Sequence, residues 1–167
     1  PEIVAKILAN RETNDSYIDE FLRPSLKDNL PDPNIVINME ESIKIIIKKI
    51  RSNKSIGLLG DYDVDGASSS AVLYKYFNDI GIYPEVYIKN RLNDGYSISK
   101  NSIDFYLKKK IKFLIALDCG TNDLINIEYA KKKGIDILVI DHHEVKSLGK
   151  PISIINPKLV NDESGLD

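Results

Sequence analysis

Acidic residues and histidines follow three short apolar runs of the chain, at 55–59, 113–117 and 136–140. They are Asp61, Asp63, Asp65, Asp118, Asp141, His142 and His143. If the runs are neighbouring parallel strands, their carboxyl ends meet at one rim of a sheet, where ligands bind. Like charges packed this closely repel strongly in a partly dry site unless cations neutralise them. The pattern therefore predicts a metal centre.

The types and spacing of these side chains narrow the choice of metal. Asp61, Asp63 and Asp65 alternate, so in an extended segment they would share one side, and Gly66 permits a sharp turn afterwards. Carboxylates with imidazoles and without thiolates suit Mn²⁺ or Mg²⁺ better than structural zinc. The ligands suffice for two ions about 3.5–4 Å apart, an arrangement that generates hydroxide and stabilises phosphoryl charge in phosphoester hydrolysis.

Strands and helices must alternate to position these residues. The predicted strands cover 55–59, 83–88, 113–117, 136–140 and 152–155. The predicted helices between them cover 67–80, 99–110 and 123–133. Near-continuous Ile, Leu and Val predict strands buried on both faces, so we expect an α/β fold: a doubly wound, mainly parallel sheet with helices on both faces. The first amides of the helix at 67–80 would point at the acidic rim, which makes Ser68 a candidate substrate contact.

Residues 1–37 are predicted to form a short helical N-terminal arm, and residues 38–167 the catalytic domain. Helical spacing covers 2–10, and a second short helix is expected at 15–22. A further helix should start near Asn38. Its predicted buried stripe is Ile43, Ile46, Ile47 and Ile50.

Composition excludes several classes of protein. The 167 residues are 43% hydrophobic and 29% charged, as in an ordinary globular domain, and no apolar run is long enough to cross a membrane. The single cysteine, Cys119, excludes an internal disulfide framework, fits a reducing cytoplasm and is interpreted as a buried small residue. The net charge of −2 leaves nucleic-acid binding open, because two divalent cations would change it to −2 + 4 = +2. The chain starts at Pro1 and stops at Asp167, so we expect a fragment of a longer protein.

Each feature also has a simpler interpretation when taken alone. A lone Asp-x-Asp is usually a solvated turn, Asp118 could cap a helix or end a strand, and adjacent histidines are often surface residues. The lysine runs at 48–49, 108–110 and 131–133 are interpreted mainly as solvated faces at helix ends. The combination of acids and histidines at strand ends favours the metal centre.

The chain resembles the DHH phosphoesterase superfamily and, within it, the RecJ single-stranded-DNA exonucleases. GDYDVDG at 60–66, ALDCGTN at 116–122 and DHHE at 141–144 carry the resemblance, in the family's order. Weaker similarities cover 7–11, 21–33, 90–99 and 155–158, so nearly the whole chain is included.

The resemblance implies roles for individual residues. The implied metal ligands are Asp63, Asp65, Asp118 and His142, with Asp118 as the bridging candidate. Asp61 would be a further ligand or a hydrogen-bond acceptor behind the ligands. His143 would contact the scissile phosphate or protonate the leaving group, while Asp141 would hold an imidazole in its useful tautomer. The implied substrate contacts are Arg91 and Tyr96.

The implied activity is divalent-metal-dependent hydrolysis of single-stranded DNA, from the 5′ end, in repair and recombination. The implied cofactor is Mn²⁺ or Mg²⁺, with two ions bound, and the implied partner is single-stranded DNA. The implied location is the cytoplasm, without a membrane. Repair or helicase proteins stay open as further partners. Leu59 stands where the pyrophosphatase and short-oligonucleotide branches have a histidine, which favours the RecJ branch. The family's fourth motif and C-terminal domain are not in the sequence, so we expect a domain truncated at its C-terminal side that can be inactive alone.

Three alternatives remain open at this stage. A DHH phosphodiesterase could act on short oligonucleotides or cyclic dinucleotides. A non-catalytic signalling domain, such as a phospho-accepting receiver, also gathers aspartates around Mg²⁺ but does not need Asp-His-His. A RecJ relative could also be retained only as a scaffold.

Overall fold

The computed structural model describes residues 1–11, 18–52, 54–95 and 97–166, in two compact units, Pro1–Pro33 and Asn34–Asp167. The described residues of the first unit form the short helices α1 (Glu2–Asn10), α2 (Ile18–Leu22) and α3 (Leu26–Asn29). The helix expected over 15–22 is present from Ile18, and its first three residues lie outside the described ranges. None of the helices described is long and apolar enough to cross a membrane.

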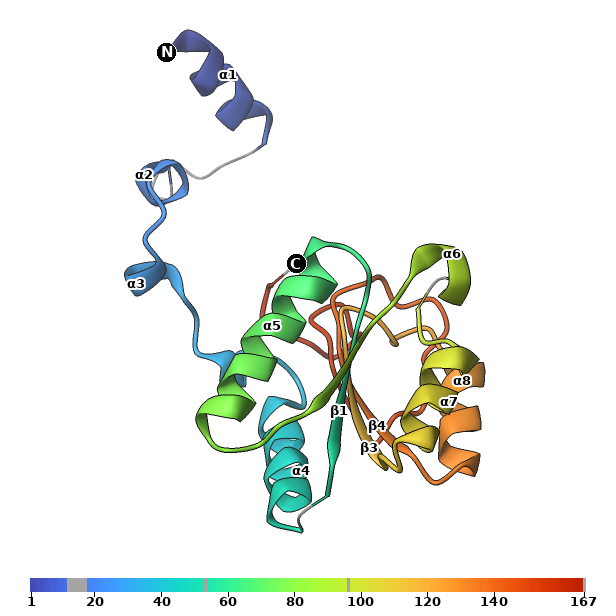
Figure 1. Cartoon of the computed structure of the whole chain (residues 1–167). Coiled ribbons are helices and arrows are strands. Elements are labelled where there is room, and N and C mark those ends of the chain that lie inside the picture. The colour runs from blue at the N-terminus through green and yellow to red at the C-terminus, as the bar shows by residue number, and fades with distance from the viewer. Residues whose placement is uncertain (12–17, 53, 96, 167) are drawn as a thin grey trace. The chain divides into compact units, whose positions relative to one another are not determined.

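The second unit is built on a five-stranded parallel sheet in the order β2-β1-β3-β4-β5 (Figure 1). Its strands are β1 (Ile56–Gly60), β2 (Glu85–Ile88), β3 (Phe113–Leu117), β4 (Asp136–Ile140) and β5 (Ser153–Ile155). All four pairings are parallel, and β1 and β3 are buried along their whole length. The predicted α/β fold with a parallel sheet is therefore confirmed.

Helices cover both faces of this sheet (Figure 1). The longer ones are α4 (Met39–Arg51) and α5 (Val64–Asp79) on one face, and α7 (Lys100–Lys108) and α8 (Leu124–Lys132) on the other. The structure also describes a 3-10 turn, η2 (Pro33–Ile35), where the two units join along the chain, and the short helix α6 (Arg91–Asp94). Phe77 of α5 packs against one face of the sheet, and Tyr106 of α7 packs against the other, so the unit has a core on each side.

The buried stripe predicted for α4 is partly wrong. Ile46 and Ile50 pack against the sheet, but Ile43 and Ile47 are 42% and 40% exposed. The buried arc is centred elsewhere because Ser42 is fully buried and its hydroxyl hydrogen-bonds the hydroxyl of Ser153 at 2.8 Å. A polar residue at the centre of the arc is invisible to a search for apolar spacing.

The start of α5 also differs from the prediction. The helix begins at Val64, three residues before the expected Ala67, because Asp63 serves as its N-cap. The Asp63 carboxylate accepts hydrogen bonds from the amides of Asp65 and Gly66, both at 3.1 Å. A Cβ on Gly66 would lie 2.4–2.6 Å from backbone atoms of Asp61, so only glycine allows this approach.

We predict that Gly66→Ala destabilises the domain by about 2 kcal/mol or more, because the added methyl must displace the Asp61 backbone. Chemical denaturation measures the effect. Val72→Ala, at a 72% exposed position of the same helix, is the matched control and should change stability by less than about 0.5 kcal/mol. Equal stability of the two variants would contradict the close approach.

Candidate metal centre

The strand order fixes where the acidic residues meet. The chain runs from β1 outward to β2 and then returns to β3 on the other side of β1, so the switch point lies between β1 and β3. Asp61 follows β1 and Asp118 follows β3, one on each side of that point. The amides of Asp61, Asp118 and Asp141 each donate to the carbonyl at the end of the next strand, at 3.3, 2.9 and 3.0 Å. The sheet ladder thus holds all three backbones in place.

Asp118 is the centre of the cluster. His142 Nε2 lies 3.1 Å and His143 Nδ1 4.0 Å from its Oδ1. One ligand atom from each of the three residues lies within 4.8 Å of the others, as in a metal site. Asp118 has a left-handed backbone (φ 59°), a rare conformation outside glycine that is typical of functional sites.

The Asp118 carboxylate is buried, and neither of its oxygens has a hydrogen-bond partner among the described residues. Burial, and after it the neighbouring carboxyl of Asp63, together raise its pKa to about 6. Hydrogen bonds from Gly66 and Asp65 instead lower the pKa of Asp63. A cation would give the buried Asp118 oxygens a partner and would neutralise the repulsion between the carboxylates of Asp118 and Asp63. These residues therefore fit a divalent metal ion.

Asp141 orients His143. Its Oδ1 lies 2.7 Å from Nδ1 of His143 and also accepts the amides of His142 and His143, at 2.8 and 3.2 Å. Its Oδ2 accepts the amide of Thr121 at 3.0 Å. Burial raises the pKa of Asp141, but these hydrogen bonds outweigh burial and lower it overall. Burial lowers the pKa of His143, but Asp141 outweighs that effect and raises it overall.

Three polar residues that sequence analysis did not single out fix the loops around this cluster. Asn156 donates to the Thr121 hydroxyl at 2.9 Å and to the His143 carbonyl at 3.0 Å. Asn122 accepts the amide of Lys146 at 2.8 Å and donates to the carbonyl of Glu144 at 2.9 Å. Their signal was present in the segments 116–122 and 155–158, which carried the resemblance without an assigned role.

A buried lysine was also missed. The side chain of Lys89, just after β2, is fully buried, and its Nζ lies 3.5 Å from Oδ1 of Asp61, which is 4% exposed. The same oxygen accepts the Tyr62 amide at 2.7 Å. Asp61 therefore has a cation of the protein's own beside it, unlike Asp118. An isolated lysine between a strand and a polar segment gave no sequence signal for this pair.

The structure places the remaining candidate residues differently from the prediction or does not describe them. Asp65 is exposed in the first turn of α5, so the alternating aspartates do not form the expected extended segment. Ser68 is exposed and lies beyond the first turn, its hydroxyl 3.4 Å from the Asp65 carbonyl, because the helix starts earlier than predicted. Arg91 begins α6, not a loop, and its guanidinium lies 5.1 Å from the Tyr62 ring centroid. Tyr96 lies outside the described residues.

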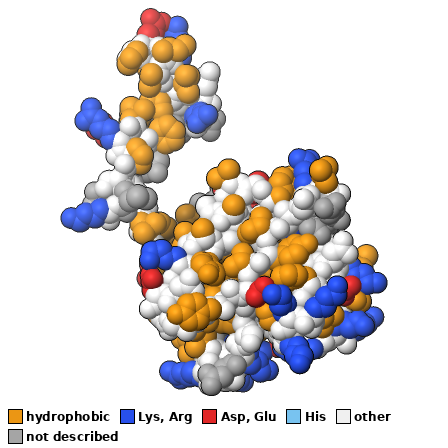
Figure 2. Space-filling view, in the orientation of Figure 1, with side chains coloured by type: hydrophobic (Ala, Val, Ile, Leu, Met, Phe, Trp, Pro, Cys, Tyr) orange, Lys and Arg blue, Asp and Glu red, His pale blue; other side chains and the backbone are white. Residues whose placement is uncertain are grey.

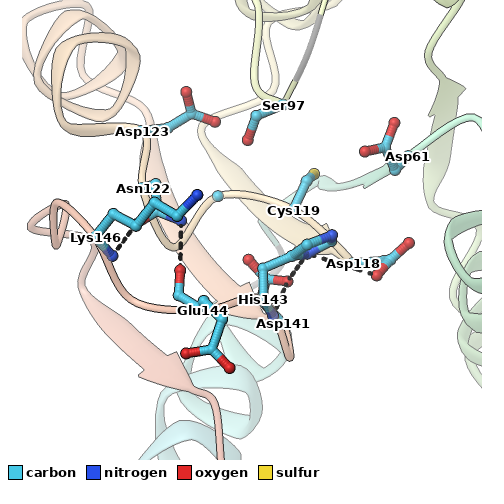
Figure 3. Close-up of a pocket in the computed structure, with 11 residues that line it drawn as sticks. Asp61, Ser97, Asp118, Cys119, Asn122, Asp123, Asp141, His143, Glu144 and Lys146 are labelled. Carbon is cyan, nitrogen blue, oxygen red and sulfur yellow. Dashed lines mark hydrogen bonds and ion pairs between the residues drawn. The ribbon is translucent and has the colours of Figure 1, made fainter. Parts of the chain in front are cut away.

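A cavity of about 430 Å³ opens beside the cluster (Figure 3). Asp61, Asp118, Asp141 and His143 line it, and further lining residues include Ser97, Asn122, Asp123, Glu144 and Lys146. Cys119 also borders it but is buried, and burial raises the pKa of its thiol, as expected of a structural cysteine. Leu59 is fully buried in the core and offers no ligand to the site.

Comparisons with known proteins show the family to which the chain is similar. Residues 55–167 match the model of the DHH family, N-terminal domain. The chain is 28% identical to the single-stranded-DNA-specific exonuclease RecJ of Escherichia coli over 161 residues, covering 95% of this chain and 27% of that protein. It is also 28% identical to RecJ of Haemophilus influenzae over 148 residues, covering 87% of this chain and 25% of that protein.

Solved structures agree in fold. A crystal structure of exonuclease RecJ bound to manganese superposes with a TM-score of 0.68 at 24% identity, covering 76% of this chain and 33% of that chain. The chain spans about a quarter of the length of the two exonucleases compared above. In this chain, the match to the family model, residues 55–167, includes all three motifs.

We predict that Asp118→Asn stabilises the metal-free protein at pH 7.5, by an amount of order 1 kcal/mol. The folded pKa, about 6, is above the ordinary 3.8, so ionisation of Asp118 costs stability as pH rises from about 4 to about 6, and the cost is complete above that range. Urea denaturation in EDTA at pH 5 and 7.5 measures this. Added Mn²⁺ should stabilise the wild type but not the variant.

Asp79→Asn, which removes an exposed carboxylate, is the control and should leave both the pH dependence and the Mn²⁺ effect unchanged. A destabilised Asp118→Asn variant at pH 7.5, or one still stabilised by Mn²⁺, would contradict the assignment of Asp118 as a buried cation ligand.

We further predict that Lys89→Met costs about 3–5 kcal/mol, because it leaves Asp61 buried without its cation. The double variant Lys89→Met/Asp61→Asn should recover most of the loss. Lys75→Met removes the exposed pair with Asp79 and should cost at most about 1 kcal/mol. Denaturation of the wild type, Lys89→Met, Asp61→Asn and the double variant measures the coupling free energy, and Lys75→Met is measured beside them. A Lys89→Met cost as small as that of Lys75→Met would refute the buried pair.

Proposed function

Because the chain belongs to the DHH family, we propose that it is the N-terminal catalytic part of a divalent-metal-dependent exonuclease that hydrolyses single-stranded DNA from the 5′ end. The observation that carries this proposal is the pair of buried Asp118 oxygens, which have no hydrogen-bond partner among the described residues, with His142 at 3.1 Å and the Asp63 carboxyl beside them. The similarity to RecJ exonucleases supports the choice of single-stranded DNA as substrate.

The residues proposed to hold Mn²⁺ or Mg²⁺, two ions in all, are Asp63, Asp65, Asp118 and His142. When bound, such ions would activate water and stabilise negative charge on the phosphoryl oxygens. Asp118 is the bridging candidate because, in the part of the chain that the structure describes, neither of its oxygens has a hydrogen-bond donor. Asp61 is proposed to accept hydrogen bonds next to the ligands and not to bind the metal itself, since Lys89 and the Tyr62 amide already contact its Oδ1.

His143 is proposed to donate the proton that the leaving oxygen needs. A carboxylate only accepts, so Nδ1 of His143 is the donor in the 2.7 Å contact with Asp141, which supports the proposal that Nε2 contacts the substrate. Hydrolysis forms one bond from water oxygen to phosphorus and breaks one phosphorus–oxygen ester bond, whose oxygen takes the proton of His143. The attacking water releases one proton to solvent, and His143 regains a proton from solvent, so the ring ends the cycle as it began. Asp141 positions the ring throughout, held in turn by the Thr121 amide.

Substrate contacts are proposed for Arg91, Ser68 and Tyr96. This role is best supported for Arg91, because its guanidinium lies over the ring of Tyr62, the residue between Asp61 and Asp63 in the sequence.

We also propose that the protein acts in repair and recombination and is located in the cytoplasm. The single buried cysteine supports the location. Partner proteins of the repair or helicase type belong to the same proposal. The domain division at residues 37 and 38 also stays a prediction.

We predict that Asp63→Asn and His142→Ala each reduce hydrolysis of single-stranded DNA by at least about 100-fold, because each removes a metal ligand. The assay uses the full-length protein, Mn²⁺ and a labelled single strand. Val72→Ala, at an exposed position of α5, should retain wild-type activity.

Two outcomes would contradict the proposal. Unchanged nucleolysis in either ligand variant would exclude the metal centre as the catalytic site. Faster turnover of cyclic dinucleotides than of long single strands, or phosphorylation of an aspartate by acetyl phosphate without nucleolysis, would indicate one of the alternative functions.

A further inference from the structure

Positive charge gathers at the end of the sheet opposite the acidic rim. The helices α4, α7 and α8 each lead into a strand, so their C-terminal ends lie beside the N-terminal ends of β1, β3 and β4. Eleven of the chain's 23 Lys and Arg residues lie in these helix ends and the loops that follow. We call them the basic pole: Lys48, Lys49, Arg51, Lys54, Lys108, Lys109, Lys110, Lys112, Lys131, Lys132 and Lys133.

Direct contacts join the three helix ends into one surface. Lys112 Nζ donates to the Lys133 carbonyl at 3.2 Å, which links the loop after α7 to the end of α8. Lys49 Nζ, from α4, donates to Asp136 at the start of β4 and lies 5.4 Å from the Phe113 ring centroid at the start of β3. Figure 2 shows Lys and Arg side chains along the lower edge of this unit, where α4, α7 and α8 end in Figure 1.

The basic pole carries far more positive than negative charge. Among the described residues, its only carboxylate partners are Asp136, paired with Lys49, and Glu85, which is 2.9 Å from Lys109. Apart from Lys49, which is half-buried, the residues of the pole are exposed. Attraction to helix dipoles accounts for lysines in a last helical turn, but not for Lys54, Lys110 and Lys112, which lie in loops. Cations this close repel one another in water of physiological salt, where charges interact over about 8 Å.

We propose that the basic pole binds the phosphate backbone of nucleic acid, duplex DNA in particular, outside the hydrolytic centre. The choice of nucleic acid as the polyanion rests on the proposed function. The preference for duplex rests on the pole itself, because two of its lysines cover neighbouring rings: Lys109 lies 5.6 Å from the Phe105 centroid and Lys133 5.6 Å from that of Tyr129.

Rings covered in this way do not offer a platform for stacking unpaired bases, on which single-strand sites depend. Phosphate contacts alone favour the duplex, which carries one charge per about 1.7 Å of axis, twice the density of one strand. The pole would thus hold double-stranded DNA that flanks a single-stranded substrate, while hydrolysis takes place at the opposite end of the sheet.

The test removes one exposed cation from each part of the pole in the full-length protein: Lys54→Gln, Lys110→Gln and Lys132→Gln together. The matched control, Lys6→Gln/Arg23→Gln/Lys27→Gln, removes the same number of exposed cations at positions outside the pole. Fluorescence anisotropy with a labelled duplex, in EDTA and at several salt concentrations, measures binding. We expect the pole variant to bind several-fold more weakly and to lose about 2–3 from the slope of log Kd against log salt, while the control retains both.

Equal duplex binding by the pole variant and the control, or no duplex binding by the wild type, would overturn the proposal. Hydrolysis of a short single strand in Mn²⁺ separates this proposal from the proposed function. If the wild type hydrolyses no single strand but only the pole variant loses duplex binding, the proposed function fails and the pole stands. If hydrolysis proceeds and duplex binding is the same in all three proteins, the proposal for the basic pole is contradicted and the proposed function stands.

Discussion

A carboxylate removed from water must be met by a proton, by hydrogen-bond donors or by a cation, and this requirement governs the rim of the sheet. The other buried carboxylates there have partners within the protein: Lys89 and a backbone amide beside Asp61, and three amides and an imidazole around Asp141. Asp118 has the histidine cluster nearby but no donor to either oxygen among the described residues. The unmet requirement at one residue identifies where a metal ion would lie.

The fold supplies this arrangement through its strand order. Parallel strands end at the same rim, and the change of direction between β1 and β3 opens the crevice there. Asp61, Asp118 and Asp141 each follow a strand, and the amide of each continues the hydrogen-bond ladder of the sheet. The ladder therefore holds their backbones in place at the site. The same topology collects the helix C-termini, with their lysines, at the opposite end. Separation of negative and positive charge is thus a consequence of one architecture.

The sequence predicts the strands and the converging acids well, because unbroken Ile, Leu and Val runs followed by Asp leave few alternatives to a buried parallel sheet. It fails where a tertiary contact outweighs a local pattern. Asp63 caps α5 and so moves the helix start, and buried Ser42 rotates the buried arc of α4 away from Ile43. The Lys89–Asp61 pair joins residues that follow two different strands, which no local spacing reveals.

The central claim is that the carboxylate of Asp118 binds a divalent cation together with the neighbouring histidine. Crystals of the protein soaked in Mn²⁺ and measured for anomalous scattering test it most directly. The account predicts an anomalous peak in contact with an oxygen of Asp118 and with Nε2 of His142. Manganese bound only elsewhere, or a map without a peak beside an ordered Asp118 at neutral pH, would contradict it.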